Sequence, residues 1–150
     1  MSQEITRTER SALIRQFTVL LSSTRWGARL ARLLTTAHLG EWGLPSESAA
    51  QIVAELAANA LVHGRVRGRD FRLDLAVHGG GTGVGAVLRI EVSDARGEHL
   101  PPGPGGMAVP GDDCESGRGL LIVEALADRW GVSPGPVPRK TVWAELDLVP

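Results

Sequence analysis

The sequence predicts a two-layer α/β sandwich, in which helices cover one face of a β-sheet. Some segments alternate apolar and polar residues, as half-buried strands do, and others carry apolar residues at helical spacing. Strands and helices of these two kinds bury all their apolar faces only if the helices lie together on one side of the sheet. The strand-like segments lie at about 16–21, 71–77, 88–93 and 142–148, and the helical ones at about 24–39, 46–63 and 118–130.

Length and composition indicate one domain. A chain of 150 residues with 43% hydrophobic and 22% charged residues can bury one substantial core. Residues 1–14 are polar and poorly periodic, which predicts a flexible leader. Residues 15–150 are expected to form a single domain.

The first strand and the first helix follow the leader. Phe17, Val19 and Leu21 alternate with polar neighbours, which indicates a strand. A helix is expected from Thr24 to Leu39, because glycines and Pro45 follow that stretch and end it.

The second helix has clear start and stop signals. Ser46 is a good N-cap, and Glu47 complements the positive end of the helix dipole. The helix is expected to end near His63 and Gly64, since glycine suits the left-handed C-cap position. Its core-facing stripe consists of Ala49, Ile52, Val53, Leu56 and Ala60.

Two alternating strands, Phe71 to Val77 and Leu88 to Ser93, flank a run of glycines. The run Gly79–Gly85 fits neither a GxGxxG register nor a Walker-type motif. It is therefore expected to be a hairpin tip rather than a phosphate site.

Residues 95–116 break the rhythm with prolines and glycines. A loop of this length inside a compact domain is either a functional lid or disordered. A third helix is expected from Arg118 to Trp130 with Gly131 at its end, then a stiff proline turn and a final strand, Val142 to Leu148.

Charge and cysteine content exclude several classes. The chain has 16 basic and 17 acidic residues, so it lacks the basic footprint of a nucleic-acid binder. Arginines outnumber acids within residues 1–40, which indicates either a docking surface for an acidic partner or a solvated helix face.

Cys114 is the only cysteine, so an internal disulfide is excluded. The sequence has no apolar run near the ~20 residues that a membrane helix needs, and no signal-peptide core. We therefore expect no membrane span and a cytoplasmic location.

The first segment with candidate chemistry lies on the second helix. Glu55 and Asn59 are four residues apart, so they project from adjacent turns on one side. A carboxylate and an amide oxygen so placed suit a divalent cation with its water shell. The alternatives are that Glu55 is an exposed helix residue and that the Asn59 side chain satisfies a buried backbone group.

The second segment is Asp94, where a strand runs into the long loop. A carboxylate there can accept a hydrogen bond from the exocyclic amine of a base. Equally, Asp94 can cap a turn.

The third segment surrounds Gly117 and Gly119, at the expected start of the third helix. Exposed N–H groups and the helix dipole favour an anion such as phosphate, and glycine permits its close approach. An ordinary glycine-rich helix entry has the same sequence.

Taken in order, these segments resemble the N, G1 and G2 boxes of the GHKL ATPases, which include histidine kinases, gyrase-type topoisomerases and heat-shock chaperones. The likeness runs from about Gln16 to Leu148. The N-box Glu55-Leu56-x-x-Asn59-Ala60-x-x-His63-Gly64 most resembles that of anti-sigma-factor serine/threonine kinases. The segments Gly117-Arg118-Gly119-Leu120-x-Ile122-Val123 and Lys140-Thr141-Val142-Trp143 are similar to the same kinases.

The resemblance implies a Bergerat ATP-binding fold with a mixed, mostly antiparallel sheet, and ATP and Mg²⁺ as cofactors. Asn59 would ligate Mg²⁺, Glu55 would act as the catalytic base, and Asp94 would bind the adenine amine. Thr141 would support the adenine site. The full cofactor-binding set implied is Asn59, Asp94, Gly97, Gly117, Arg118, Gly119, Leu120 and Thr141.

One segment departs from the family pattern. The G1 box is usually Asp-x-Gly-x-Gly, whereas Arg96 and Glu98 stand at its glycine positions and Gly97 is one place out of register. This departure predicts weaker nucleotide binding or little turnover.

The resemblance therefore implies an ATP-dependent protein kinase that binds a sigma factor and phosphorylates a small anti-anti-sigma (STAS-type) protein. A homodimer is implied as well. The alternative, favoured by the altered G1 box, is a non-catalytic nucleotide-binding interaction module of the same fold.

Overall fold

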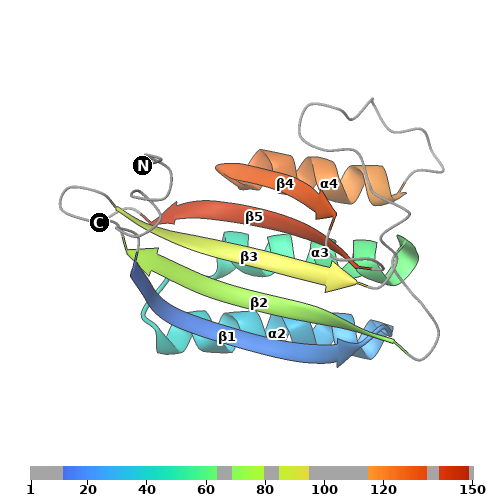
Figure 1. Ribbon diagram of the computed structural model, residues 1–150, viewed down its shortest axis with the longest axis horizontal. Coiled ribbons are helices and arrows are strands. Elements are labelled where there is room, and N and C mark those ends of the chain that lie inside the picture. Colours follow the sequence, from blue (N-terminus) through green and yellow to red (C-terminus); the bar gives the residue numbers. More distant parts are fainter. Residues whose placement is uncertain (1–11, 64–68, 80–84, 95–114, 135–138, 149–150) are drawn as a thin grey trace.

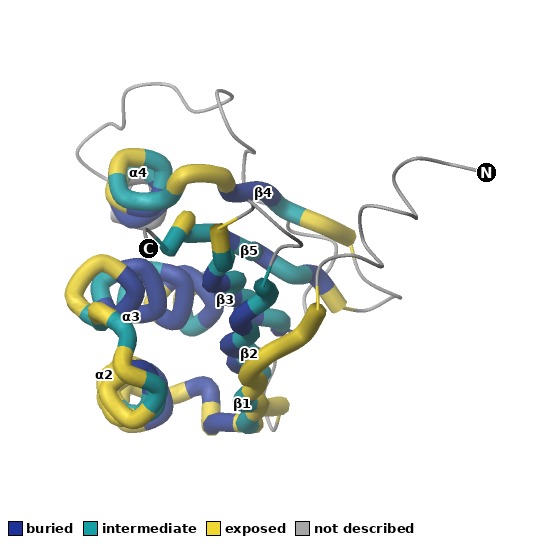
Figure 2. The backbone as a smooth tube through the Cα atoms, turned by 90° about the vertical axis from the view of Figure 1, so that its left-hand side faces the viewer, coloured by how far each residue is buried: buried dark blue, intermediate teal, exposed yellow. Residues whose placement is uncertain are grey.

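The computed structural model describes residues 12–63, 69–79, 85–94, 115–134 and 139–148. A five-stranded sheet forms one layer and three helices form the other (Figures 1 and 2), which confirms the predicted two-layer sandwich. The elements are β1 Ala12–Ser22, α2 Arg25–Glu41, α3 Glu47–His63, β2 Asp70–Gly79, β3 Ala86–Asp94, α4 Glu115–Leu126, β4 Arg129–Pro134 and β5 Lys140–Leu148.

The sheet has the strand order β1-β2-β3-β5-β4. Every neighbouring pair among the described strands is antiparallel, so the described sheet lacks the parallel pairing that a mixed sheet would have. β2 and β3 pair along their length as the predicted hairpin strands. The crossover through α4 and β4 brings β5 beside β3, which places the end of β3 against the start of β5.

The core lies between the sheet and the helices. The predicted inward stripe of α3 is buried, as are the alternate apolar residues of β2 and β3. Because side chains of a strand alternate between faces, the intervening residues lie on the other, open face of the sheet. The buried set on these three elements is Ala49, Ile52, Val53, Leu56, Ala60, Phe71, Leu73, Leu75, Val77, Leu88, Ile90 and Val92.

Helix α2 begins where the sequence indicates. The Thr24 side chain accepts a hydrogen bond from the Gly27 N–H at 3.1 Å, as an N-cap residue does. A Cβ at Gly27 would lie 1.9 Å from the Ser22 carbonyl oxygen, so glycine lets the helix pass close to β1. After the helix, Gly43 adopts a φ of +73°, which glycine tolerates best.

The first strand begins earlier than predicted. β1 starts at Ala12, so the last three residues of the expected 1–14 leader belong to the sheet. Leu13 and Ile14 are both exposed, and the pairing with β2 shifts between Leu13 and Arg15. This stretch therefore lacks the alternation that would have revealed a strand.

The predicted helix from Arg118 to Trp130 is wrong at both ends. α4 begins at Glu115 and ends at Leu126, and Trp130 belongs to β4, a strand that the sequence did not indicate. Trp130 is buried on the strand and also fits the helical spacing, so periodicity alone did not separate the two. Pro134 ends β4, an edge strand, where a missing N–H is tolerated.

Several predictions fall outside the described residues. They are the leader up to residue 11, the hairpin tip at 80–84, the lid over 95–114 and the proline turn at 135–138. Gly97, with Arg96 and Glu98, lies within the lid segment.

Candidate functional site

Four chain segments meet at one end of the molecule. The C-terminal half of α3, the end of β3, the beginning of β5 and the beginning of α4 lie at the same end in Figure 1. α3 contacts α4, β3 and β5 directly. The described residues of the three sequence boxes are carried by these segments, so folding gathers their elements in one region.

Asn59 is the most unusual polar residue of this region. It is 4% exposed, and its Oδ1 accepts no hydrogen bond from the described part of the chain. A buried amide oxygen without a partner costs about 1–3 kcal/mol. A polar ligand at Oδ1 would remove that cost, so the atom marks a position for one.

Glu55 lies one helical turn before Asn59 and is half-buried. The Gln51 side chain donates a hydrogen bond to Glu55 Oε1 at 3.0 Å. On α4, a Cβ at Gly119 would lie 2.9 Å from Glu55 Oε2. The second glycine of the G2-like segment thus lets the carboxylate approach α4, and Gln51, which the sequence did not single out, helps to orient it.

Asp94 ends β3 directly opposite Lys140, the first residue of β5. Both are buried, with Lys140 0% and Asp94 5% exposed. Lys140 Nζ lies 3.8 Å from Asp94 Oδ2, an ion-pair distance. Lys140 is the principal residue that sequence reasoning missed.

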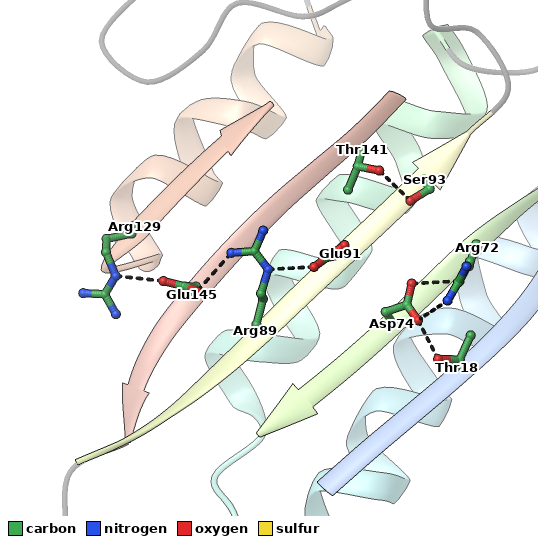
Figure 3. A network of polar contacts seen from close by, with 9 residues as sticks. All are labelled: Thr18, Arg72, Asp74, Arg89, Glu91, Ser93, Arg129, Thr141 and Glu145. Carbon is green, nitrogen blue, oxygen red and sulfur yellow. Dashed lines mark hydrogen bonds and ion pairs between the residues drawn. The ribbon is translucent and has the colours of Figure 1, made fainter. Parts of the chain in front are cut away.

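Thr141 does not lie with Asp94 as expected. Its side chain forms a 2.8 Å hydrogen bond with Ser93 on the open face of the sheet (Figure 3). Val142 and Ala144 are buried under the helices, so alternation along β5 puts Lys140 on their face and Thr141 on the other. Alternation in the sequence indicates the face of each of these residues, but not the pairing of Lys140 with Asp94.

The remaining predicted site residues lie on α4. Gly117 and Arg118 belong to its first turn, where helix N–H groups lack intrahelical partners; their side-chain surroundings fall outside the described residues. Gly119 and Leu120 follow in the next turn, and the Leu120 side chain is part of the core. Backbone N–H groups, rather than the Leu120 side chain, are what this segment can offer an anion.

The open face of the sheet carries a separate polar network (Figure 3). Arg89 pairs with Glu91 at 2.6 Å and with Glu145 at 3.0 Å, and Arg129 pairs with Glu145 at 2.9 Å. Burial raises the pKa of Glu145, but the hydrogen bonds from Arg129 and Arg89 outweigh it and hold that pKa below its ordinary value of 4.5. The charges of this face largely neutralise one another.

A hollow of about 460 Å³ lies on the same open face. It is lined by residues of β1, β2, β3 and the start of β5, among them Arg72, Arg89, Ser93, Arg139 and Thr141. Glu55, Asn59, Asp94 and Gly119 do not line it. This hollow and the region around Asn59 are therefore different places.

A three-helix, antiparallel-sheet sandwich with an N-box-like helix against a glycine-rich helix start is the architecture of GHKL ATPase domains. A family model for the histidine kinase-like ATPase domain matches residues 21–144, and the chain belongs to that family.

The chain is also similar to a solved structure. The crystal structure of the RsbU and RsbW domains of Rv1364c from Mycobacterium tuberculosis is 22% identical, with a TM-score of 0.58. The match covers 90% of this chain and 33% of that one, and it shows a shared fold. A search of curated protein sequences finds no match. None of the helices in the described residues has the length and apolarity to cross a membrane.

Proposed function

We propose that this protein is an ATP-binding serine/threonine kinase of the anti-sigma-factor type, which regulates transcription by partner switching. The observation that carries the proposal is the buried Oδ1 of Asn59, which has no partner among the described residues. Asn59 follows Glu55 by one turn on α3, whose C-terminal half lies at the same end of the molecule as the end of β3 (Figure 1). Membership of the histidine kinase-like ATPase family supports ATP as the ligand.

The residues present fit ATP with Mg²⁺. Asn59 Oδ1 is a hard oxygen donor of the kind that Mg²⁺ prefers, and the ion would offset charge on the phosphates. The beginning of α4, with Gly117 and Arg118 in its first turn and Gly119 directly after them, would hold the phosphates through backbone N–H groups. Asp94 would accept a hydrogen bond from the adenine amine.

Glu55 would act as the general base. Gln51 and the contact with Gly119 hold its carboxylate between α3 and α4. There it would take the proton of a serine hydroxyl as the serine oxygen bonds to the terminal phosphorus and ADP leaves. Positioning contributes most to such a transfer, so a few oriented groups suffice.

The partners proposed are a sigma factor and a small anti-anti-sigma (STAS-type) protein. The outer face of α2 supports a protein partner: Trp26 is 62% and Leu33 56% exposed, and Arg25, Arg29 and Arg32 are exposed beside them. An apolar strip flanked by arginines suits an acidic, amphipathic segment. The similar crystal structure includes an RsbW domain, which supports the proposal of these partners.

The test combines binding with phosphate transfer. Calorimetric titration of the wild type with ATP is expected to show binding that weakens when EDTA replaces Mg²⁺, and Asn59→Ala is expected to lose that dependence. Labelled ATP should transfer phosphate to a serine of a STAS-type protein, and Glu55→Gln should abolish transfer while ATP still binds. Absence of binding at millimolar ATP would overturn the proposal.

The second candidate function is a non-catalytic interaction module of the same fold. Arg96 and Glu98 at the G1 glycine positions favour it. In that case Glu55→Gln would leave partner binding intact, and no phosphate would reach any candidate partner. Transfer that Glu55→Gln abolishes excludes this candidate.

A cytoplasmic location and a homodimer stay predictions. Light scattering of the purified chain with and without ATP measures the oligomeric state.

A further inference from the structure

The proposed function gives no role to Lys140, although its side chain is fully buried beside Asp94. Removing an ammonium group from water is costly even when a carboxylate compensates it. Two apolar residues in these positions would often be as stable or more so. We therefore expect the buried pair of Lys140 and Asp94, at the proposed ligand-binding end of the fold, to have a chemical role.

The geometry places the two groups side by side. Lys140 and Asp94 face each other in the β3–β5 pair, and such residues project to the same face with Cβ atoms about 4.5–5.5 Å apart. That face is the one covered by the helices, since Val142 and Ala144 share it. An ammonium has three donors and a carboxylate about four acceptor sites, so each group can take part in more than one hydrogen bond.

We propose that Lys140, which lies beside Asp94, donates a hydrogen bond to ring atom N1 of adenine. The proposed function already assigns the neighbouring exocyclic amine to Asp94. Adenine presents a donor and an acceptor next to each other in that order, whereas guanine in the same orientation presents an acceptor and then a donor. Guanine would place an acceptor against the Asp94 carboxylate and a donor against the Lys140 ammonium, so the pair makes the site selective for ATP over GTP. This inference rests on the proposed function.

The competing explanation is a purely structural ion pair. In that case Lys140 would affect folding and overall affinity, but not the relative affinity for two nucleotides that differ at one base atom. The ratio of two affinities measured on one variant separates the explanations, because it does not depend on the fraction of protein that is folded.

The experiment measures dissociation constants of Mg-ATP, Mg-GTP and 1-deaza-ATP, in which a carbon replaces N1. The wild type is expected to bind 1-deaza-ATP about tenfold or more weakly than ATP, as for loss of a hydrogen bond to a charged group. Lys140→Met should bind ATP and 1-deaza-ATP equally. The matched control is Arg139→Met, which removes the same charge one residue away, on an exposed side chain of the open face.

If Lys140→Met folds poorly, the double variant Lys140→Met with Asp94→Asn removes both buried charges and keeps an acceptor at position 94. Its dissociation constants for 1-deaza-ATP and ATP should also be nearly equal. A wild-type ratio near one, an unchanged ratio in Lys140→Met, or GTP bound as tightly as ATP would overturn the inference while the kinase proposal stands. Failure of the wild type to bind ATP would overturn both.

Discussion

At Gly119, a hydrogen atom in place of a methyl group leaves room for the carboxylate of Glu55, the proposed general base. The Glu55 carboxylate occupies the space that a side chain at 119 would need, with Oε2 2.9 Å from the place of a Cβ. The constraint falls on the flexible end of a side chain and not on backbone, so it concerns function more than stability.

For Gly119→Ala we expect at least a tenfold loss of phosphate transfer, because Glu55 must rotate away from its position. The free energy of unfolding should change by less than about 1 kcal/mol, since alanine favours the helix and the carboxylate can move. Transfer rates and urea unfolding measure the two effects.

Gly40→Ala is the matched control, because Gly40 is exposed and a Cβ there meets nothing within 4 Å. It should stabilise the protein by roughly 0.5–1 kcal/mol and leave transfer unchanged. Equal effects of both variants on transfer would contradict the assignment of Gly119.

Glu145 gives a pH-dependent prediction at the same scale. Its pKa is lowered in the folded state, so its stabilising contribution is present above the ordinary value of 4.5 and is lost as pH falls below it. At pH 7, Glu145→Gln should lower the free energy of unfolding by about 1 kcal/mol, because two arginine hydrogen bonds to a carboxylate are weakened.

Denaturant titrations of the wild type and Glu145→Gln between pH 7 and pH 3 test this. The two stabilities should converge in acid, where Glu145 is protonated. A difference that stays constant with pH would show that the carboxylate charge is not the cause.

At the scale of elements, β4 depends on the contact between Gly131 and Trp143. A Cβ at Gly131 would lie 2.8 Å from the indole ring, which also packs under Arg89 with the guanidinium 4.3 Å from the ring centre. The sequence suggested that Gly131 ends a helix, but the glycine instead admits a large ring from the neighbouring strand.

Gly131→Ala should therefore destabilise the fold by about 1–3 kcal/mol, the cost of overpacking against a rigid neighbour. Ser133→Ala, exposed on the same strand, should change stability by less than about 0.5 kcal/mol. Guanidinium unfolding followed by tryptophan fluorescence measures both, and equal values for the two variants would contradict the role of the ring contact.

Elements with strong local signals were predicted well. The glycines and Pro45 after the first helix and the five-residue stripe of α3 specified two helices, and alternation specified β2 and β3. β4 and the start of β1 were missed, because a short edge strand and an exposed strand end carry no clear period of two. Their pairing is decided by neighbouring strands that lie elsewhere in the sequence.

For the whole molecule, ligand binding and stability are linked. A ligand that binds only the folded state at 100 times its dissociation constant stabilises it by about 2.7 kcal/mol. For a chain of 150 residues this corresponds to a rise in Tm of roughly 5–10 °C.

Thermal unfolding in increasing Mg-ATP should show this rise in the wild type. At the same ATP concentration the rise should be much smaller in Asp94→Asn, which loses the charged acceptor. Identical shifts in both proteins would argue against Asp94 as the base-binding residue.

By itself the sequence determined the sandwich and predicted candidate residues for a site, because periodicity, caps and the three boxes are local properties. It therefore placed Glu55, Asn59 and Asp94 on the correct elements. Only the tertiary structure decided which of two adjacent residues, Lys140 or Thr141, lies beside Asp94, and that Gly119 touches Glu55. Strand register and helix contact join residues far apart in the chain, and no local pattern fixes the distance between them.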